Sequence, residues 1–402
     1  MSSPSARRKA LRLAVVGTGE RSSLALAAND KTTGDEIVAA VDTSEAGRLR
    51  AVARFGSGIT VHSNLRDLVR AGGIDAAFVT TPDVTHAPIA IELLRAGIAV
   101  YLEKPMATTL EDADAILTAA HETQTPLYVG HNYRHAAVVK LMRSIILRGE
   151  IGQVKAVWCR HFVGNGGDYY FKDWHADRRN TNTLLLQKAS HDLDVMHWLA
   201  GGYTKRVVAM GDLAVYGQIT DRADRSGQMM QEWLSYDNWP PLSQTGLNPV
   251  VDVEDVSMML MELDNGVLAS YEQCHFTPDY WRNYTVIGTE GRLENFGDVE
   301  GGVVRVWNSR GGYRAFGDVD YPIVEDLEGH QAADGLAVAE FIAHITDRSP
   351  TQTSLIAARN AVAAGALAAR SMRNGSVPLD VPPLDPAIVD YIERISGTST
   401  PQ

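Results

Sequence analysis

The feature that most restricts the fold is a short apolar segment that runs into a glycine-rich turn. Residues 11–16, LRLAVV, predict a buried strand because the run is short, apolar and stopped by glycine. GTGERS follows at 17–22, and SLALAAND at 23–30 predicts a helix. Strand, glycine turn and helix in this order are typical of the first unit of a parallel α/β sheet.

The glycine turn has the residues that a dinucleotide needs. Gly17 permits the tight turn, and Gly19 lets the backbone approach a pyrophosphate. The phosphates would lie at the N-terminus of the following helix, which also carries Arg21 and Ser22. Ser22 stands where the third glycine of the motif is expected, so this turn alone is weak support for a cofactor site.

The next predicted strand, EIVAAVD at 36–42, strengthens the interpretation. It ends in Asp42, about 25 residues after the first glycine, close to the interval at which an acid meets the adenosine ribose. A carboxylate accepts hydrogen bonds from ribose hydroxyls and repels a 2′-phosphate, so NAD is favoured over NADP. The alternative is that Asp42 is only a turn residue.

Strands and helices continue to alternate after this point. Further strands are predicted at 74–82, 98–105 and 126–130, and helices at 63–71, 86–97 and near 110–121. This alternation predicts a doubly wound (Rossmann) parallel sheet in a first domain, residues 1–135. Ligands bind such sheets beyond the carboxyl ends of the strands, where GTGERS, VDTS, TTPDVTH and EKP lie.

Size and charge restrict the remaining possibilities. The 402 residues exceed one ordinary hydrophobic core, so two domains are expected. A net charge of -12 disfavours nucleic acid and anionic membranes as partners. Cys159 and Cys274 are far apart and lack metal-ligand spacing, which predicts a reducing compartment and no metal. No apolar run reaches the length of a signal core or membrane span, so we expect a soluble cytoplasmic protein.

The segment TTPDVTHAPIAIELLRAGIAVYLEKP, residues 80–105, closely resembles the Gfo/Idh/MocA family, named for glucose–fructose oxidoreductase and inositol dehydrogenase. The N-terminal resemblance covers residues 10–135. It implies that Lys104 is catalytic beside the nicotinamide, in a lysine–proline bond that is often cis, and that Glu103 packs nearby. It also implies that Thr81, Pro82 and His86 form the loop over the cofactor. The alternative is that Lys104 is only a solvated lysine before a turn.

The resemblance further implies a second domain, residues 136–402, which is α+β with a large, mostly antiparallel sheet. The segments VKAVWCRHFV, VSMMLMELDNGVLASYEQCHF and GVVRVWNS predict its strands, with a hairpin-like turn at 264–266. In the family the open face of this sheet often forms a subunit interface, which implies a homodimer or homotetramer. The helix at 353–372 is expected to pack back on the first domain.

The stretch LLLQKASHDLD, residues 184–194, has two interpretations. One is structural: Ser190 caps a short helix whose first turn carries acidic residues. The other follows from the family motif D-x-x-x-H, in which the histidine is a general base. His191 matches that histidine, but Gln187 replaces the aspartate, and Lys188 fits a subgroup with K-x-x-H-x-x-D. On this view His191 is catalytic, and Asp194 either orients it or is only a helix-end acid.

Cations and aromatic side chains near this stretch predict a sugar pocket. Guanidinium groups bind carboxylates and sulfonates by paired hydrogen bonds, and aromatic rings stack on pyranoses. A solvated loop is the alternative, and strand alternation leaves open which residues of 273–295, including Trp281, Arg282 and Tyr284, face the cofactor. Asp334 and Gly329-His330 are weaker candidates for a pocket edge. The expected substrate-binding residues are Tyr133, Trp174, Arg178, Arg179, Gln187, Lys188, His275 and Tyr280.

Three functions remain open. The first is an NAD-dependent enzyme that oxidises a ring hydroxyl of an anionic pyranose, since hydride departs only as the hydroxyl proton is removed by a base. The second is an NAD-dependent glycosidase that oxidises C3 transiently, eliminates the C1 substituent, adds water and re-reduces, for example on a sulfoquinovoside. The third is a non-catalytic NAD-binding regulator, against which the presence of Lys104 and His191 argues.

Overall fold

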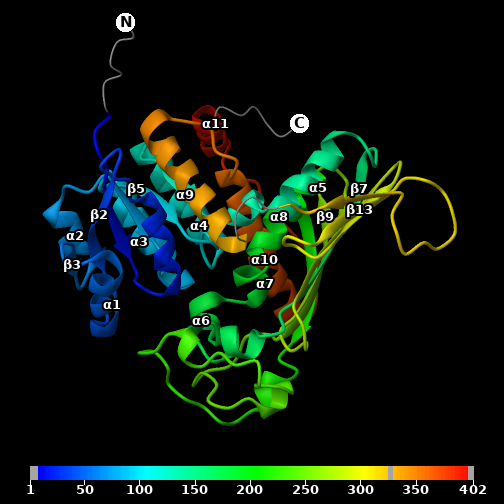
Figure 1. Ribbon diagram of the computed structural model, residues 1–402, viewed down its shortest axis with the longest axis horizontal. Coiled ribbons are helices and arrows are strands. Elements are labelled where there is room, and N and C mark those ends of the chain that lie inside the picture. The colour runs from blue at the N-terminus through cyan, green and yellow to red at the C-terminus, as the bar shows by residue number, and fades with distance from the viewer. Residues whose placement is uncertain (1–7, 325–328, 397–402) are drawn as a thin grey trace, which may run out of the picture.

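The computed structural model describes residues 8–324 and 329–396, with the side chains of 329–332 left outside the description. Two sheets dominate it, one on each side of a layer of helices (Figure 1). None of the helices in the described ranges is both long and apolar enough to cross a bilayer.

The first sheet is parallel throughout and has six strands in the order β3-β2-β1-β4-β5-β6. The strands are short and nearly all buried because helices cover both faces. The strand bounds are β1 Arg12–Val16, β2 Glu36–Val41, β3 Thr60–His62, β4 Ala76–Val79, β5 Ala99–Leu102 and β6 Leu127–Val129. The helices between them are α1 Glu45–Phe55, α2 Leu65–Ala71, α3 His86–Arg95 and α4 Leu110–Thr123. The predicted parallel α/β fold is confirmed.

The connection after β1 differs from the predicted α-helix. It is a 3₁₀ helix, η1, over Glu20–Ala28. The hydroxyls of Ser22 and Ser23 each donate to the carbonyl three residues back, at 2.8 and 3.1 Å. Such side-chain bonds compete with α-helical hydrogen bonding and favour the tighter turn.

The second sheet has nine strands in the order β14-β13-β12-β11-β7-β10-β9-β8-β15. All neighbours are antiparallel except β7 and β10, so the predicted mostly antiparallel sheet is confirmed. Its strands are β7 Val154–Phe162, β8 Thr204–Asp212, β9 Val256–Leu263, β10 Leu268–Cys274, β11 Trp281–Gly288, β12 Arg292–Phe296, β13 Val303–Trp307, β14 Val319–Pro322 and β15 Leu379–Asp380.

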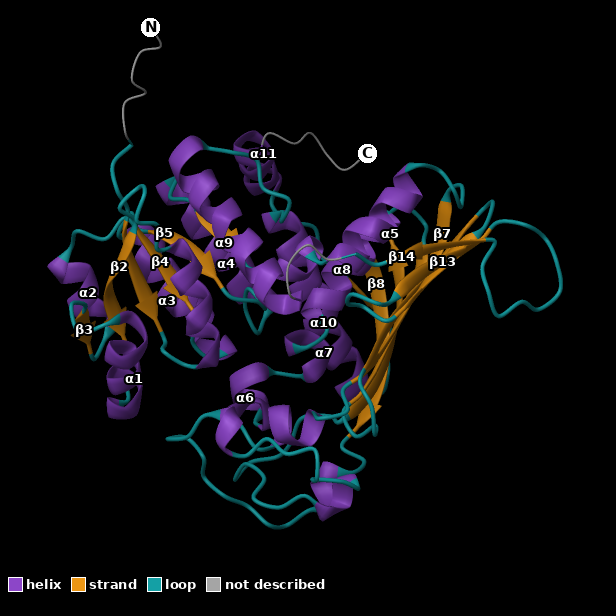
Figure 2. Cartoon of the chain, in the orientation of Figure 1, coloured by secondary structure: helices purple, strands orange, loops and turns teal. Residues whose placement is uncertain are grey.

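One face of this sheet packs against helices and the other does not (Figure 2). The packed face contacts α8 Ser190–Ala200, with α5 Ala137–Leu147, α6 Arg178–Thr181 and α7 Leu184–Gln187 nearby in the chain. Strand alternation sends large apolar side chains outward on the other face. Those exposed there are Trp158, Met210, Met258, Leu260 and Leu268.

The last helices return to the first sheet (Figure 1). They are α9 Gly329–Asp347, α10 Leu355–Arg373 and α11 Pro386–Ser396. Phe341 of α9 lies in the same apolar cluster as β1 and β4, while Val362 of α10 and Ile392 of α11 join the cluster on the opposite face. α10 also packs on α8 and β8, so it touches elements of both sheets.

Candidate active site

The glycine turn after β1 has the shape of a dinucleotide cradle. Gly17 has φ +86°, and a Cβ there would lie 2.6 Å from Thr81 Cγ2 and 2.9 Å from Thr81 N. A side chain is therefore excluded on both backbone and packing grounds. At Gly19 no atom of the described residues comes within 4 Å of an added Cβ, which leaves the backbone open to a pyrophosphate.

The two other residues predicted in this turn already have partners. Arg21 forms ion pairs with Glu103 at 2.6 Å and with Asp334 at 2.8 Å. Ser22 is buried and donates to the Gly19 carbonyl. Their role toward the cofactor therefore stays a prediction. In the structure, Arg21 connects the glycine turn to the end of β5 and to α9.

Asp42 follows β2 and points at the glycine turn. Its Oδ2 accepts from the amide and hydroxyl of Thr18, at 3.0 and 2.7 Å, and its Oδ1 accepts from Ser44 N and Oγ, at 2.9 and 2.8 Å. Burial raises the pKa of Asp42, but these donors outweigh it and the pKa falls below its usual value. The residue is thus held as an anion beside the glycine turn, and its contact with a ribose stays a prediction.

The predicted loop over the cofactor is tied to the EKP turn. The His86 ring, at the start of α3, lies 3.0 Å from the Thr81 carbonyl and 2.8 Å from the Pro105 carbonyl. Pro82 precedes a 3₁₀ turn, η2, over Asp83–Thr85. The bond between Lys104 and Pro105 is cis. His86 therefore braces the ends of β4 and β5 against each other.

Lys104 lies between the two sheets. Its Nζ donates to the main-chain carbonyl of Gln187 at 3.1 Å, so the end of β5 meets the end of α7. Burial lowers the pKa of Lys104, while the carboxylates of Asp83 and Glu103 oppose this shift. Glu103 is itself held by Arg21 and by the Lys104 amide.

The buried carboxyl of Asp83 was absent from the sequence-based site. Its Oδ2 accepts from the Thr181 hydroxyl at 3.0 Å. Burial raises the pKa of Asp83 to about 7, against the opposing charge of Lys104. The available signal was its position within TTPDVTH, at the carboxyl end of a strand where ligands bind.

The 184–194 stretch folds as two short helices. Thr183 caps α7, whereas α8 begins after Ala189, which makes no side-chain cap, so the predicted capping by Ser190 is wrong. The His191 ring is 6.3 Å from that of His131 and 6.2 Å from that of Tyr133. Burial, followed by the charge of Lys104, holds the pKa of His191 well below its usual value, so the imidazole is neutral.

Asp192, not Asp194, is the carboxylate of α8 that bonds to side chains of the large sheet. Asp194 is bound by Arg134 through two hydrogen bonds of 2.6 and 2.8 Å and does not orient His191. Asp192 accepts from the tyrosine hydroxyls of Tyr271 and Tyr284 and from His161 Nδ1, the last at 2.8 Å. The spacing of three residues from His191 favoured Asp194 as the acid that orients the imidazole. The partners of Asp192 could not be found in this way, because they lie on strands far away in the chain.

The predicted substrate-binding residues divide into two groups. Lys188 is within 5.8 Å of the Tyr170 ring centroid, and Tyr170 is 5.2 Å from the ring of buried His275. Burial and the charge of Arg282 lower the pKa of Lys188 to about 7. Tyr133 and Tyr280 both donate to Asp298, at 3.0 and 2.8 Å. Lys188, His275, Tyr133 and Tyr280 form the first group, which lies around α8. The second group is the cationic loop.

The cationic loop at 172–179 is less involved. Arg178 pairs with Asp252 at 3.2 Å, and exposed Arg179 pairs with Asp177. Trp174 stacks on His175 with 3.7 Å between ring centroids. Because both arginines are already ion-paired and partly or largely exposed, we do not assign the anion site to them. The side chain of His330 lies outside the described residues.

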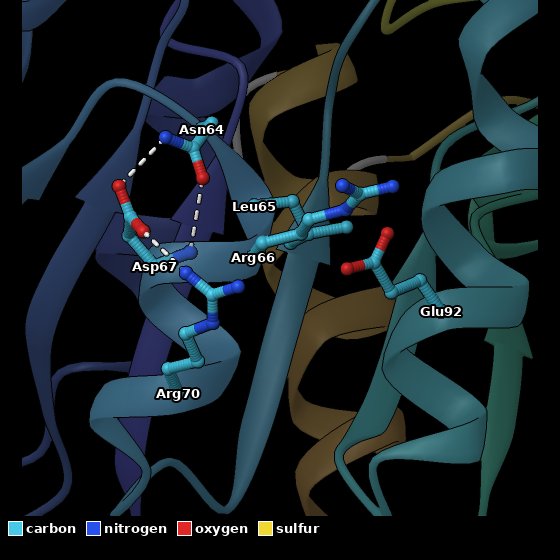
Figure 3. Close-up of a pocket in the computed structure, with 6 residues that line it drawn as sticks. All are labelled: Asn64, Leu65, Arg66, Asp67, Arg70 and Glu92. Carbon is cyan, nitrogen blue, oxygen red and sulfur yellow. Dashed lines mark hydrogen bonds and ion pairs between the residues drawn. The ribbon is translucent and has the colours of Figure 1, made fainter.

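Two further features bear on the chemistry. Among the described residues, no group of three or more His, Cys, Asp or Glu side chains is placed to hold a metal. A separate surface hollow lies beside α2 and α3 (Figure 3), where Asp67 already pairs with Asn64 and Arg70. It contains none of the residues discussed above.

The chain resembles known proteins over most of its length. A model of an oxidoreductase family with an NAD-binding Rossmann fold matches residues 11–131, and a GFO/IDH/MocA C-terminal domain model matches residues 139–294. A 1,5-anhydro-D-fructose reductase of Ensifer adhaerens is 27% identical over 264 residues, covering 65% of this chain and 69% of that protein. An inositol 2-dehydrogenase of Corynebacterium glutamicum is 25% identical over 266 residues, covering 66% and 67%.

A solved structure of levoglucosan dehydrogenase in complex with NADH and levoglucosan superposes with a TM-score of 0.74 at 19% identity, covering 93% of this chain and 100% of that one. Across the first curated relatives the chain spans 55% to 69% of their own length. The geometry of the glycine turn and Asp42 suits the cofactor that the family model names. The chain is therefore a member of the Gfo/Idh/MocA oxidoreductase family and carries that family's NAD-binding Rossmann domain.

Proposed function

We propose that this protein oxidises a ring hydroxyl of an anionic pyranose, with NAD as the hydride acceptor. The observation that carries the proposal is the meeting of a buried lysine, Lys104, with a neutral histidine, His191, at the carboxyl edge of the parallel sheet. The charge of Lys104 acts on His191, so the two groups share one environment. The relatives named for 1,5-anhydro-D-fructose and inositol support a small polyhydroxylated substrate.

Three sets of residues would bind the cofactor, accept the hydroxyl proton and stabilise the developing charge. Gly17, Gly19 and Asp42 hold the dinucleotide by its phosphates and ribose. Neutral His191 accepts the hydroxyl proton, which makes hydride departure possible from the same carbon. Lys104 donates to the sugar oxygen and stabilises the negative charge that develops there. Bound NAD supplies the electron-pair acceptor.

A second candidate is supported by an excess of proton-transfer groups. Lys188 and Asp83 both have pKa values shifted to about 7, and a net dehydrogenase needs neither. A glycosidase that works by transient oxidation needs more proton transfers. After the sugar is oxidised at C3, a base removes the C2 proton, the C1–O bond breaks, water adds to the alkene, and the ketone is reduced again. A sulfoquinovoside is one such substrate.

A paired assay separates the two candidates. Neutral, carboxylated and sulfonated sugars and their aryl glycosides are incubated with NAD, while NADH absorbance and aglycone release are followed together. The dehydrogenase proposal predicts stoichiometric NADH without aglycone release. Aglycone release that requires NAD and leaves no net NADH supports the glycosidase. NAD binding without turnover of any sugar contradicts both and supports a non-catalytic regulator.

The setting of the protein is also part of the proposal. We propose that it acts in the cytoplasm as a homodimer or homotetramer. Both Cys159 and Cys274 are free thiols, which suits a reducing compartment. The apolar outer face of the large sheet supports association.

A further inference from the structure

The side chain of Arg282 is buried between the large sheet and α8. It lies on β11 directly opposite His161 of β7, and only 2% of the residue is exposed. Its guanidinium carbon is 4.1 Å from the centroid of the Tyr133 ring. Alternation along β11 places Arg282 and Tyr284 on the same face, toward Asp192.

Arg282 has donors to spare. Its Nε lies 3.2 Å from Asp192 Oδ1 as an ion pair, yet neither Nε nor Nη1 makes a hydrogen bond within the described residues. Asp192 is already engaged by two tyrosine hydroxyls and by His161. Buried donors without acceptors are costly in a folded protein, so such groups call for a ligand.

The surroundings of Arg282 also contain buried polar atoms without hydrogen-bond partners among the described residues. His161 Nε2 and both ring nitrogens of His275 are buried and lack hydrogen-bond partners in the described ranges. Lys188 is in no ion pair there, and it feels the charges of both Arg282 and Lys104. An anion entering this space would relieve the mutual repulsion of Arg282, Lys188 and Lys104 and would accept from the open N–H groups of Arg282.

We propose that Arg282, assisted by Lys188, binds the anionic oxygen-bearing substituent of the pyranose and so sets the preference for acidic sugars. A guanidinium presents parallel N–H groups that match the oxygens of a carboxylate or sulfonate. The ring of the sugar would then lie toward Lys104 and His191, whose pKa values respond to the same group of cations. This inference rests on the proposed function and names the residue that selects its substrate.

The test is calorimetric titration of the NADH-loaded protein with methyl α-glucoside, methyl α-glucuronide and methyl α-sulfoquinovoside. For the wild type we expect an anionic ligand to bind more tightly than the neutral one. Arg282→Gln is expected to weaken the anionic ligand by about tenfold to a hundredfold, the loss of a charge-assisted hydrogen bond, with less than threefold change for the neutral glycoside. Comparison of carboxylate and sulfonate shows which acid the pocket prefers.

Controls separate recognition from folding. Arg160→Gln removes an arginine of the same sheet that bonds Asn283 and lies next to His161, on the opposite face, and is expected to leave all three affinities unchanged. If Arg282→Gln fails to bind NADH, the double variant Arg282→Gln/Asp192→Asn removes both members of the ion pair and is titrated instead. Lys188→Gln, which leaves Asp192 paired, is expected to reduce anion affinity in the same direction.

Equal losses for neutral and anionic glycosides would overturn the proposal and make Arg282 a structural partner of Asp192. NADH formation tests the dehydrogenase proposal separately from the anion site. Arg282-dependent anion binding without NADH formation from any sugar would leave the anion site standing and refute the dehydrogenase. Oxidation of neutral sugars by a wild type that shows no preference for anionic ones would refute the anion site and the anionic substrate class, and would leave the NAD-dependent oxidation standing.

Discussion

Lys104 is a lysine whose surroundings disfavour its charge. Its amine is buried and donates a hydrogen bond to a main-chain carbonyl oxygen. The carboxyl of Asp83 has the largest effect among the charges that oppose the lowering of the Lys104 pKa. Such a lysine gives up its proton at lower pH than a solvated lysine does. His191 stays neutral in the same environment and is available as a base.

We expect Lys104→Ala and His191→Ala each to lower kcat/KM for sugar oxidation by about a hundredfold or more, the range of general acid–base contributions. Binding of NADH, measured by fluorescence titration, should change little for His191→Ala, because His191 lies on α8 and not in the dinucleotide turn. Near-full activity of either variant would contradict the catalytic assignment.

Asp83→Asn is expected to move the alkaline limb of the pH–rate profile. The charge of Asp83 raises the pKa of Lys104, so its removal should make Lys104 lose its proton at lower pH. The alkaline limb, which requires the protonated amine of Lys104, then shifts toward acid, while the plateau rate is retained within a few-fold. The measurement is kcat/KM from pH 5 to pH 9, about two pH units on each side of neutrality. An unmoved alkaline limb would show that Asp83 does not influence the titrating amine.

At the scale of elements, the residues at the carboxyl ends of the parallel strands could be predicted from local sequence. The glycine turn, Asp42 and the EKP turn each lie at the carboxyl end of a strand, and alternation of strands and helices brings those ends to one edge. The pairing of Asp192 with Arg282 could not be predicted from local sequence. It depends on the register of β7 with β10 and β11, and on α8 lying against these strands. Short-range spacing carries no information about that register.

Asp42→Ala is expected to weaken NAD by about tenfold, the loss of one hydrogen bond to a charged acceptor, and NADP by a smaller factor. The reason is that the carboxylate after β2 attracts ribose hydroxyls but repels a 2′-phosphate. Dissociation constants for both cofactors give the answer. Ser44→Ala, which removes one donor to Asp42 but keeps its charge, is the matched control. Equal losses for the two cofactors would remove the ribose role.

Arg359→Ala is expected to destabilise the fold by about 2–4 kcal/mol. Arg359 of α10 is buried and bridges Asp114 of α4, at 2.8 Å, and the Pro382 carbonyl, at 2.9 Å. Its loss leaves a carbonyl unsatisfied and opens a cavity between the two helices. Urea unfolding measures the change. Asp114→Asn should cost less, because the asparagine Oδ1 can still accept a hydrogen bond from Arg359 and no cavity opens.

For the whole molecule, the sequence indicated two sheets but not the route of the chain at its end. The return of 353–372 was expected, yet α9 and α11 also complete the apolar clusters of the parallel sheet. Their apolar positions match any buried helix surface, so their pattern does not specify which sheet they cover. Helices α9 and α11 therefore pack with the nucleotide-binding part, whereas α10 contacts both sheets and β15 extends the large one.

Leu260→Lys combined with Leu268→Lys is expected to reduce the molecular mass in solution from an oligomer to a monomer. These side chains are 62% and 61% exposed on the uncovered face of the large sheet, beside Met258 and Trp158. Light scattering after size exclusion measures the mass. Tyr313→Lys, at an exposed loop position after β13, should leave it unchanged. A monomeric wild type would refute the association.

The contact between Lys104 and residue 187 has an evolutionary consequence. The lysine is held by the main-chain carbonyl, while the amide oxygen of the Gln187 side chain has no hydrogen-bond partner among the described residues. Every amino acid except one that breaks α7 supplies the same carbonyl. A few nucleotide changes in one codon can therefore place or remove an acid near the imidazole without detaching the lysine. Descendants of one ancestral gene can thus exchange proton-transfer chemistries while the cofactor cradle stays intact.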